Sequence, residues 1–304
     1  MTLVVLAGLL GGFSALLLGP ASVWLSRARW LQHVPRCGVV LWQGVGLGSI
    51  LSGIAAGLAL AVSRYRVGFA GGVTELVKGI FGGRPLQGLG LYDALGLTLA
   101  ADLALVLGVC FAVVTMRTIR RRARHRKLLD LVTYESPHYP GTEFLVDERA
   151  VAYCLPGVHP RIVLSDGTVT LLEPDELWAV IHHERAHAHE RHGLVMLPMA
   201  GVSRLFSWIP YARYAPSHIS LLLEMAADDF SARRGGRRPL AAALVEMATH
   251  GWAPGCAFAA AGSGVVERVS RLLEDRPCSK SSAVLVAGLG VAVVVAPLAA
   301  VAFA

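Results

Sequence analysis

The chain has 304 residues, a formal net charge of +7 and 54% hydrophobic residues, and its mean hydropathy is +0.55. Only 16% of its residues are charged, whereas soluble domains usually carry about 25%. This composition favours a membrane protein over a soluble one. The basic residues cluster beside apolar segments, which favours a signal for membrane topology and predicts no direct contact with nucleic acid.

Four apolar stretches are long enough to cross a bilayer, since a helix needs about 20 apolar residues to do so. They cover about residues 2–25, 37–63, 94–116 and 282–304. The predicted fold class is therefore an α-helical membrane protein with four transmembrane helices. In the second stretch, small residues recur every four positions (Gly44, Gly48, Ser52 and Ala56). This pattern permits close helix packing, either within the chain or in a homodimer.

Charge next to the third stretch predicts the orientation. The sequence RTIRRRARHRK, from Arg117 to Lys127, carries seven Lys or Arg in eleven residues. The positive-inside rule places it in the cytoplasm, where we expect it to contact anionic lipids. Both chain termini then lie outside the cell. The composition, with 25 Arg against 3 Lys and much Ala, Gly and Val, favours a GC-rich bacterial genome and hence a bacterial plasma membrane.

The predicted organisation has three parts: three spans with their basic flank in residues 1–127, a cytoplasmic α+β domain in 128–281, and the fourth span in 282–304. In the domain, TEFLVDERAVAYCLPG predicts two strands, and RIVLSDGTVTLL predicts another pair around the turn Asp166-Gly167. A helix opens at Pro174 and runs to about His192. The apolar stretch 193–210 predicts a re-entrant or interface-lying segment, and a second helix covers about 217–234.

The first of these helices contains His183-Glu184-Arg185-Ala186-His187, an HExxH motif. Residues four apart share one helical face, so His183 and His187 can both bind one Zn²⁺. Glu184 can reach water at the metal and act as a general base. The other histidines here, His182, His189 and His192, point elsewhere on the helix and are expected to be solvated or to support the ligands.

A catalytic zinc also needs a third protein ligand. The second helix offers Glu224 as the favoured candidate and Asp229 as the alternative. Asp228 lies one turn after Glu224 and can accept a hydrogen bond from a ligand imidazole, which would orient that ring. An electrophilic donor could come from Tyr211, Tyr214 or His218, between the two helices. The sequence does not rank these three.

An HExxH followed by Glu-x-x-x-Asp on a later helix resembles the gluzincin-like membrane peptidases. Three spans before the motif and one after it resemble the BlaR/MecR type, the transducers of beta-lactam signals, more than the CAAX prenyl-protease/HtpX type. ERVSRLLEDRP, from Glu267 to Pro277, also resembles that branch. Those sensors carry a penicillin-binding domain after the fourth span, and this chain stops at Ala304, so the resemblance implies no beta-lactam recognition.

The resemblance implies one zinc per chain bound by His183, His187 and Glu224, with Glu184 as catalytic base and Asp228 as orienting residue. It implies a zinc endopeptidase whose substrate is a peptide or protein, such as a transcriptional repressor or the chain itself, in signal transduction. An HtpX-like quality-control protease and a non-catalytic zinc-bound sensor or scaffold are the alternatives. We also expect an extended substrate to add to a strand edge at residues 161–164.

Overall fold

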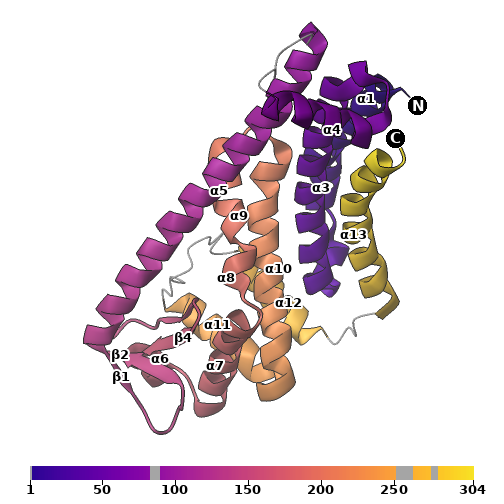
Figure 1. Cartoon of the computed structure of the whole chain (residues 1–304). Helices are drawn as coiled ribbons and strands as arrows, with labels where there is room; N and C mark the ends of the chain where they lie inside the picture. The colour runs from indigo at the N-terminus through magenta and orange to yellow at the C-terminus, as the bar shows by residue number, and fades with distance from the viewer. Residues whose placement is uncertain (1, 83–89, 251–262, 275–279) are drawn as a thin grey trace.

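The computed structural model describes residues 2–82, 90–250, 263–274 and 280–304, and this part of the chain is mostly helical (Figure 1). Four helical stretches are long and apolar enough to cross a membrane, which confirms the predicted four apolar helices. They are Leu3–Ser26 (α1, Leu3–Leu16; a π turn, Leu17–Ala21; α2, Ser22–Ser26), Pro35–Tyr65 (α3, Pro35–Val62, and a 3₁₀ turn), α5 (Leu91–Val132) and α13 (Lys280–Ala302). The π turn in the first stretch contains Pro20, which cannot donate a helical hydrogen bond.

Helix α3 is the centre of the apolar bundle and packs against α1, α5 and α13. Its small residues allow this close approach. A Cβ at Gly44 would lie 2.4 Å from the carbonyl oxygen of Gly290 in α13, and a Cβ at Gly48 would lie 2.7 Å from that of Val293. These two residues of the predicted small-residue pattern therefore pack within the chain, against the last span.

Gly44→Ala is predicted to destabilise the bundle, because the new methyl group would meet backbone that can move only by separating α3 from α13. Overpacking of this kind typically costs about 1–3 kcal/mol. A thermal melt of the purified protein in detergent should show a melting temperature several degrees lower. Gly288→Ala is the control, since a Cβ at Gly288 meets nothing within 4 Å. Equal melting temperatures for both variants would contradict this packing.

The ends of the chain lie together at one end of the bundle, and the sheet domain lies at the other (Figure 1). The apolar cluster at the first end contains Leu3 and Leu6, near the N-terminus, and Val301 and Ala304 at the C-terminus. It also contains Leu76 of α4 (Gly68–Phe81), a helix that the sequence analysis did not predict. Both ends of the chain therefore lie at the end of the bundle opposite the sheet domain.

Helix α5 is one continuous helix of 42 residues, or about 63 Å at 1.5 Å per residue. It therefore extends past the apolar bundle to the sheet domain. The expected domain boundary at residue 128 therefore lies inside this helix. Two of its basic side chains contact the domain instead of pointing only to lipid: Arg122 donates to the carbonyl of Gly193 at 3.3 Å and Arg126 to that of Pro156 at 3.4 Å.

The sheet has four strands in the order β1-β2-β4-β3. Their bounds are Thr133–Glu135 (β1), Thr142–Leu145 (β2), Ala152–Leu155 (β3) and Arg161–Ser165 (β4). One face packs on α7 (Pro174–His189) through side chains such as Ile162 and Leu164, and the other packs on Leu129 of α5 through Val163. Strand β4 lies inside the sheet between β2 and β3, so the expected substrate edge at residues 161–164 was wrong.

The predicted pair of strands around Asp166-Gly167 was also wrong, because only its first half, β4, is a strand. Helix α6 (Asp166–Leu171) follows at once. Ser165 explains the change: its hydroxyl accepts a hydrogen bond from the backbone NH of Thr168, which caps the helix. The predicted strands in 142–157 are confirmed as β2 and β3.

The remaining helices follow α7: α8 (His192–Val195), α9 (Leu197–Leu205), α10 (Pro210–Gly235), α11 (Arg237–Thr249) and α12 (Ser263–Leu273). Helices α9 and α10 pack against the spans. A Cβ at Gly201 of α9 would lie 2.5 Å from the Cys110 sulfur of α5, and the Tyr211 hydroxyl of α10 donates to the carbonyl of Trp42 in α3 at 3.2 Å. In the segment 193–210, predicted to be re-entrant or interface-lying, Gly201 thus packs on α5, and the carbonyl of Val195 accepts a hydrogen bond from Gln43 of α3 at 2.9 Å.

Candidate metal centre

Helix α7 carries the two histidines of the HExxH motif. Pro174 occupies its first turn, and the Glu176 carboxylate accepts a hydrogen bond from the backbone NH of Glu173, so the helix starts as the sequence predicted. His183 and His187 lie one turn apart, with ring centroids 4.9 Å from each other. Their Nε2 atoms are 3.1 Å apart, so both nitrogens point to one place.

Glu224 of α10 completes a group of three that could hold a metal ion. Its Oε2 lies 3.3 Å from His183 Nε2, and its Oε1 lies 3.4 Å from His187 Nε2. A tetrahedral zinc with ligands at 2.0–2.1 Å has donor atoms about 3.3–3.4 Å apart. The two histidine nitrogens are 3.1 Å apart and each has a Glu224 oxygen within 3.4 Å, so the types of donor atom and their closeness fit zinc.

The exposure of the three side chains rises from 7% for His183 to 19% for His187 and 30% for Glu224. One side of the group is thus open, as a catalytic zinc site requires for water and substrate. Glu184 is buried with 6% exposure and follows His183 on the same helix. The sequence prediction placed these four residues in one site, and the structure brings the three ligating groups together.

Asp228 and Arg268 lie behind the candidate ligands. Asp228 Oδ1 is 3.1 Å from His183 Nδ1, on the side of the ring away from Glu224. Arg268 of α12 donates two hydrogen bonds to the Asp228 carboxylate, at 2.7 and 2.8 Å, and its Nη1 lies 3.1 Å from Glu224 Oε2. One guanidinium therefore contacts both acidic residues of the predicted Glu-x-x-x-Asp pattern.

These charges control protonation in the absence of a metal. Burial opposes a charge on His183, yet the carboxylates of Asp228 and Glu224 raise the pKa of its imidazole to about 9. Burial also opposes ionisation of Asp228, but Arg268 and His183 lower its pKa to about 2. Likewise His187 and Arg268 hold the pKa of Glu224 well below its ordinary value, although burial acts to raise it.

Zinc binding is therefore predicted to weaken as the pH falls. Below a pKa of about 9 the His183 imidazole holds a proton, which zinc must displace. With one proton released, the apparent Kd rises by about tenfold for each pH unit of acidification. Competition with a chromophoric chelator at pH 6, 7 and 8 measures this slope. A Kd that does not change with pH would contradict the protonated state of His183.

Arg268→Ala is predicted to lower stability strongly, because it leaves the buried Asp228 carboxylate without its guanidinium partner. Removing one member of a buried ion pair costs about 3–5 kcal/mol. Chemical unfolding of the metal-free protein in mild detergent measures the effect. Arg149→Ala, at an exposed ion pair with Asp147, should change stability by less than about 1 kcal/mol. Equal losses in both variants would contradict this role of Arg268.

Other candidates from the sequence lie elsewhere. Asp229, the alternative third ligand, pairs with Arg271 at 2.8 Å. The hydroxyl of Tyr211 donates to the carbonyl of Trp42 in α3. The ring of His218 stacks on the Trp42 ring, with centroids 5.5 Å apart. These contacts place Asp229, Tyr211 and His218 in the packing of α10 rather than among the three ligating groups.

One residue at the site, Arg268, was missed by the sequence analysis, and another, His192, was expected to be solvated or to support the ligands but was placed on the wrong helix. Arg268 lies in the stretch 267–277, which was used only for its family resemblance and of which residues 275–277 lie outside the described residues. His192 was expected on the same helix as the motif, but α7 ends at His189. His192 is buried, and burial together with the neighbouring His187 lowers its pKa to about 4.

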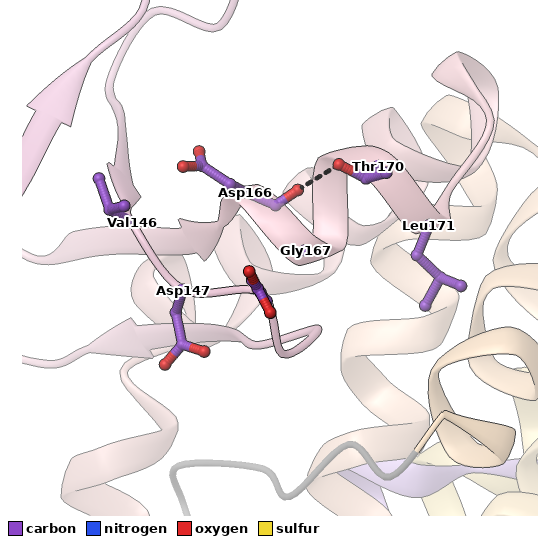
Figure 2. A pocket seen from close by; sticks show the side chains of 7 residues that line it. Val146, Asp147, Asp166, Gly167, Thr170 and Leu171 are labelled. Atoms are coloured by element: carbon purple, nitrogen blue, oxygen red, sulfur yellow. Dashed lines mark hydrogen bonds between the residues drawn. The ribbon is translucent and has the colours of Figure 1, made fainter.

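An open pocket of about 640 Å³ lies away from this centre, between the end of β2 and the start of α6. Figure 2 shows Asp147 and Asp166 among its lining residues. Both carboxylates have partners within the domain: Asp147 pairs with Arg149 at 2.7 Å, and Asp166 accepts a hydrogen bond from the Tyr134 hydroxyl at 2.6 Å. Asp147 and Asp166 therefore take part in contacts that stabilise the domain.

Comparison with known proteins gives one match. Residues 118–221 match the model of Peptidase family M48, a segment that includes the HExxH motif and ends before Glu224. The match supports a membrane-associated metallopeptidase of a zinc-dependent family, and no homologue confirms the BlaR/MecR-type branch. No curated protein and no solved structure matches the chain.

Proposed function

We propose that the protein is a membrane-embedded zinc endopeptidase that hydrolyses peptide bonds at the cytoplasmic face of a bacterial plasma membrane. The observation that carries the proposal is the set of three donor distances, 3.1, 3.3 and 3.4 Å, among His183, His187 and Glu224. The M48 match across the HExxH motif supports it independently.

In this proposal the two histidines and Glu224 hold one zinc, which when bound polarises the attacking water and the scissile carbonyl. Glu184 takes a proton from that water and passes it to the leaving amine. Asp228 Oδ1 lies 3.1 Å from Nδ1 of His183, and this ion pair is proposed to keep Nε2 directed at the metal. Arg268 keeps Asp228 ionised and in place for that role.

A peptide substrate is proposed to bind along β3. This strand is at one edge of the sheet, pairs with β4 on its other side and packs against α7, the helix that carries His183 and Glu184. An extended peptide can add to such an edge through backbone hydrogen bonds. The proposed edge replaces the one at residues 161–164.

For the biological role we propose signalling, in which the enzyme cleaves itself or a transcriptional repressor. The arrangement of three apolar helices before the domain and one after it supports this choice over an HtpX-like quality-control protease. Purified protein in nanodiscs should carry about one zinc and produce one defined fragment set. Broad cleavage of casein would favour quality control, and bound zinc with no cleavage of either kind would favour a sensor or scaffold.

A further inference from the structure

The chain turns sharply after the HExxH helix, and this turn directs His192 back to the metal centre. Arg191 has φ 52° and ψ 39°, a left-handed conformation that residues other than glycine rarely adopt. Helix α8 then starts at His192, whose side chain is only 6% exposed. The imidazoles of His192 and His187 meet edge to face, with centroids 4.7 Å apart and planes at 87°.

The contact between the two rings is specific. Nδ1 of His192 lies 2.9 Å from Nδ1 of His187, and Nε2 of His187 faces His183 and Glu224. A ligand nitrogen must be unprotonated, so in a metal-bound His187 the proton is on Nδ1. That N–H donates to Nδ1 of His192, and the proton of a neutral His192 is then on its Nε2.

Glu190 accepts at the other end of this chain of hydrogen bonds. Nε2 of His192 lies 3.3 Å from Glu190 Oε2. The same carboxylate is held by Arg36, whose Nε lies 3.0 Å from Oε2 and 3.2 Å from Oε1 and whose Nη2 makes a shorter contact with Oε1. Arg36 is the second residue of α3 and also donates to the carbonyl of Ala226 in α10 at 2.9 Å.

A second contact ties α8 to the same span. Gln43, two turns further along α3, donates to the carbonyl of Val195 at 2.9 Å. Helix α8 has only four residues. Gln43 holds its last residue, Val195, and Arg36 holds its first, His192, through Glu190. The position of α3 relative to α7 therefore fixes where the His192 ring lies.

We propose that Arg36, Glu190 and His192 are positioning residues that orient the candidate ligand His187, and that they couple the second apolar span to the metal centre. The inference rests on the proposed function, since it assumes that His187 binds zinc. A shift of α3 would reach a metal ligand through three successive polar contacts. The position of this span would thereby affect how tightly the centre binds zinc.

The test is the zinc affinity of the full chain in nanodiscs, measured by competition with a chromophoric chelator. Loss of a group that orients a metal ligand typically weakens metal binding 10–100-fold. We expect losses in this range for His192→Leu and for Arg36→Ala. His192→Asn should recover most of the affinity, because its amide oxygen can take the place of Nδ1 and accept from His187, whereas Leu has a similar size and no polar atom.

A double variant separates a connected chain from two independent effects. If Arg36 acts through His192, then Arg36→Ala combined with His192→Leu weakens zinc binding no more than His192→Leu alone. Arg149→Ala, at the exposed pair with Asp147, is the matched control and should bind zinc as the wild type does. The absorption spectrum of the cobalt-loaded protein should change in His192→Leu and return in His192→Asn.

Wild-type affinity in both His192→Leu and Arg36→Ala would overturn the proposal, as would fully additive losses in the double variant. A wild-type chain that binds no zinc overturns both this proposal and the proposed function. A wild-type chain that binds zinc, shows these losses and cleaves no substrate contradicts only the proposed function. Thermal melts of the metal-free variants show whether each one folds. The zinc affinities of the Asn and Leu variants are compared at a temperature at which both are folded.

Discussion

Glu184→Gln is expected to abolish peptide hydrolysis while zinc content stays at about one per chain. Glutamine has the shape of glutamate and cannot take a proton from water, so the variant loses the proposed base and keeps the candidate ligands. General base catalysis contributes about 10²–10⁴-fold, and we expect a fall in kcat of about 10³-fold. Metal analysis and fragment formation, measured on the same nanodisc samples, give both readouts.

The control for this experiment lies one residue further along α7. Arg185 stacks over Trp178 and donates to the carbonyl of Pro140 at 3.0 Å, so it belongs to the packing of the domain. Arg185→Gln should keep zinc and activity. Full activity in Glu184→Gln would show that another residue is the base, and loss of zinc in that variant would show that Glu184 is a ligand.

The second large effect is expected at the candidate ligands. His183→Ala should weaken zinc binding by more than about 100-fold, since even partners that only orient a ligand cost 10–100-fold. Hydrolysis should be lost together with the metal, because His187 and Glu224 alone supply only two of the three protein ligands that a catalytic zinc needs. Chelator competition and metal analysis measure the loss.

His189→Ala is the matched control, because His189 is on the same helix, is exposed, and contacts the Phe230 ring at 5.8 Å rather than the candidate ligands. It should bind zinc as the wild type does. If both variants bind zinc equally well, the metal lies elsewhere and the assignment of His183 is wrong.

The sequence predicted the parts of the centre that depend on helical periodicity. His183 and His187 share one face because residues four apart do so in any α-helix. Glu224 and Asp228 repeat that spacing on α10, and the four apolar stretches follow from length and composition. These features are local, so the pattern of residue types was sufficient to place each of them on its element.

The features that the sequence did not predict depend on contacts between distant segments or on single backbone angles. Arg268 follows Asp228 by 40 positions and reaches it only because α12 packs beside α10. His192 lies against His187 because Arg191 adopts a left-handed conformation, which is rare outside glycine. The order of the sheet puts β4 between β2 and β3, and hydrophobic alternation cannot distinguish that place from an edge.

The main apolar cluster has a practical consequence for how the protein can be produced. It joins Leu31, Trp42 and Val45 of the first 62 residues to Tyr211 and Ile219 of α10, the helix that also presents Glu224. A fragment limited to residues 128–281 would expose that side of α10 to water and would lack Arg36. A soluble fragment of the sheet domain and α10 would therefore lose the apolar packing that this cluster supplies, and biochemistry on this protein calls for the intact polypeptide in a lipid or detergent environment.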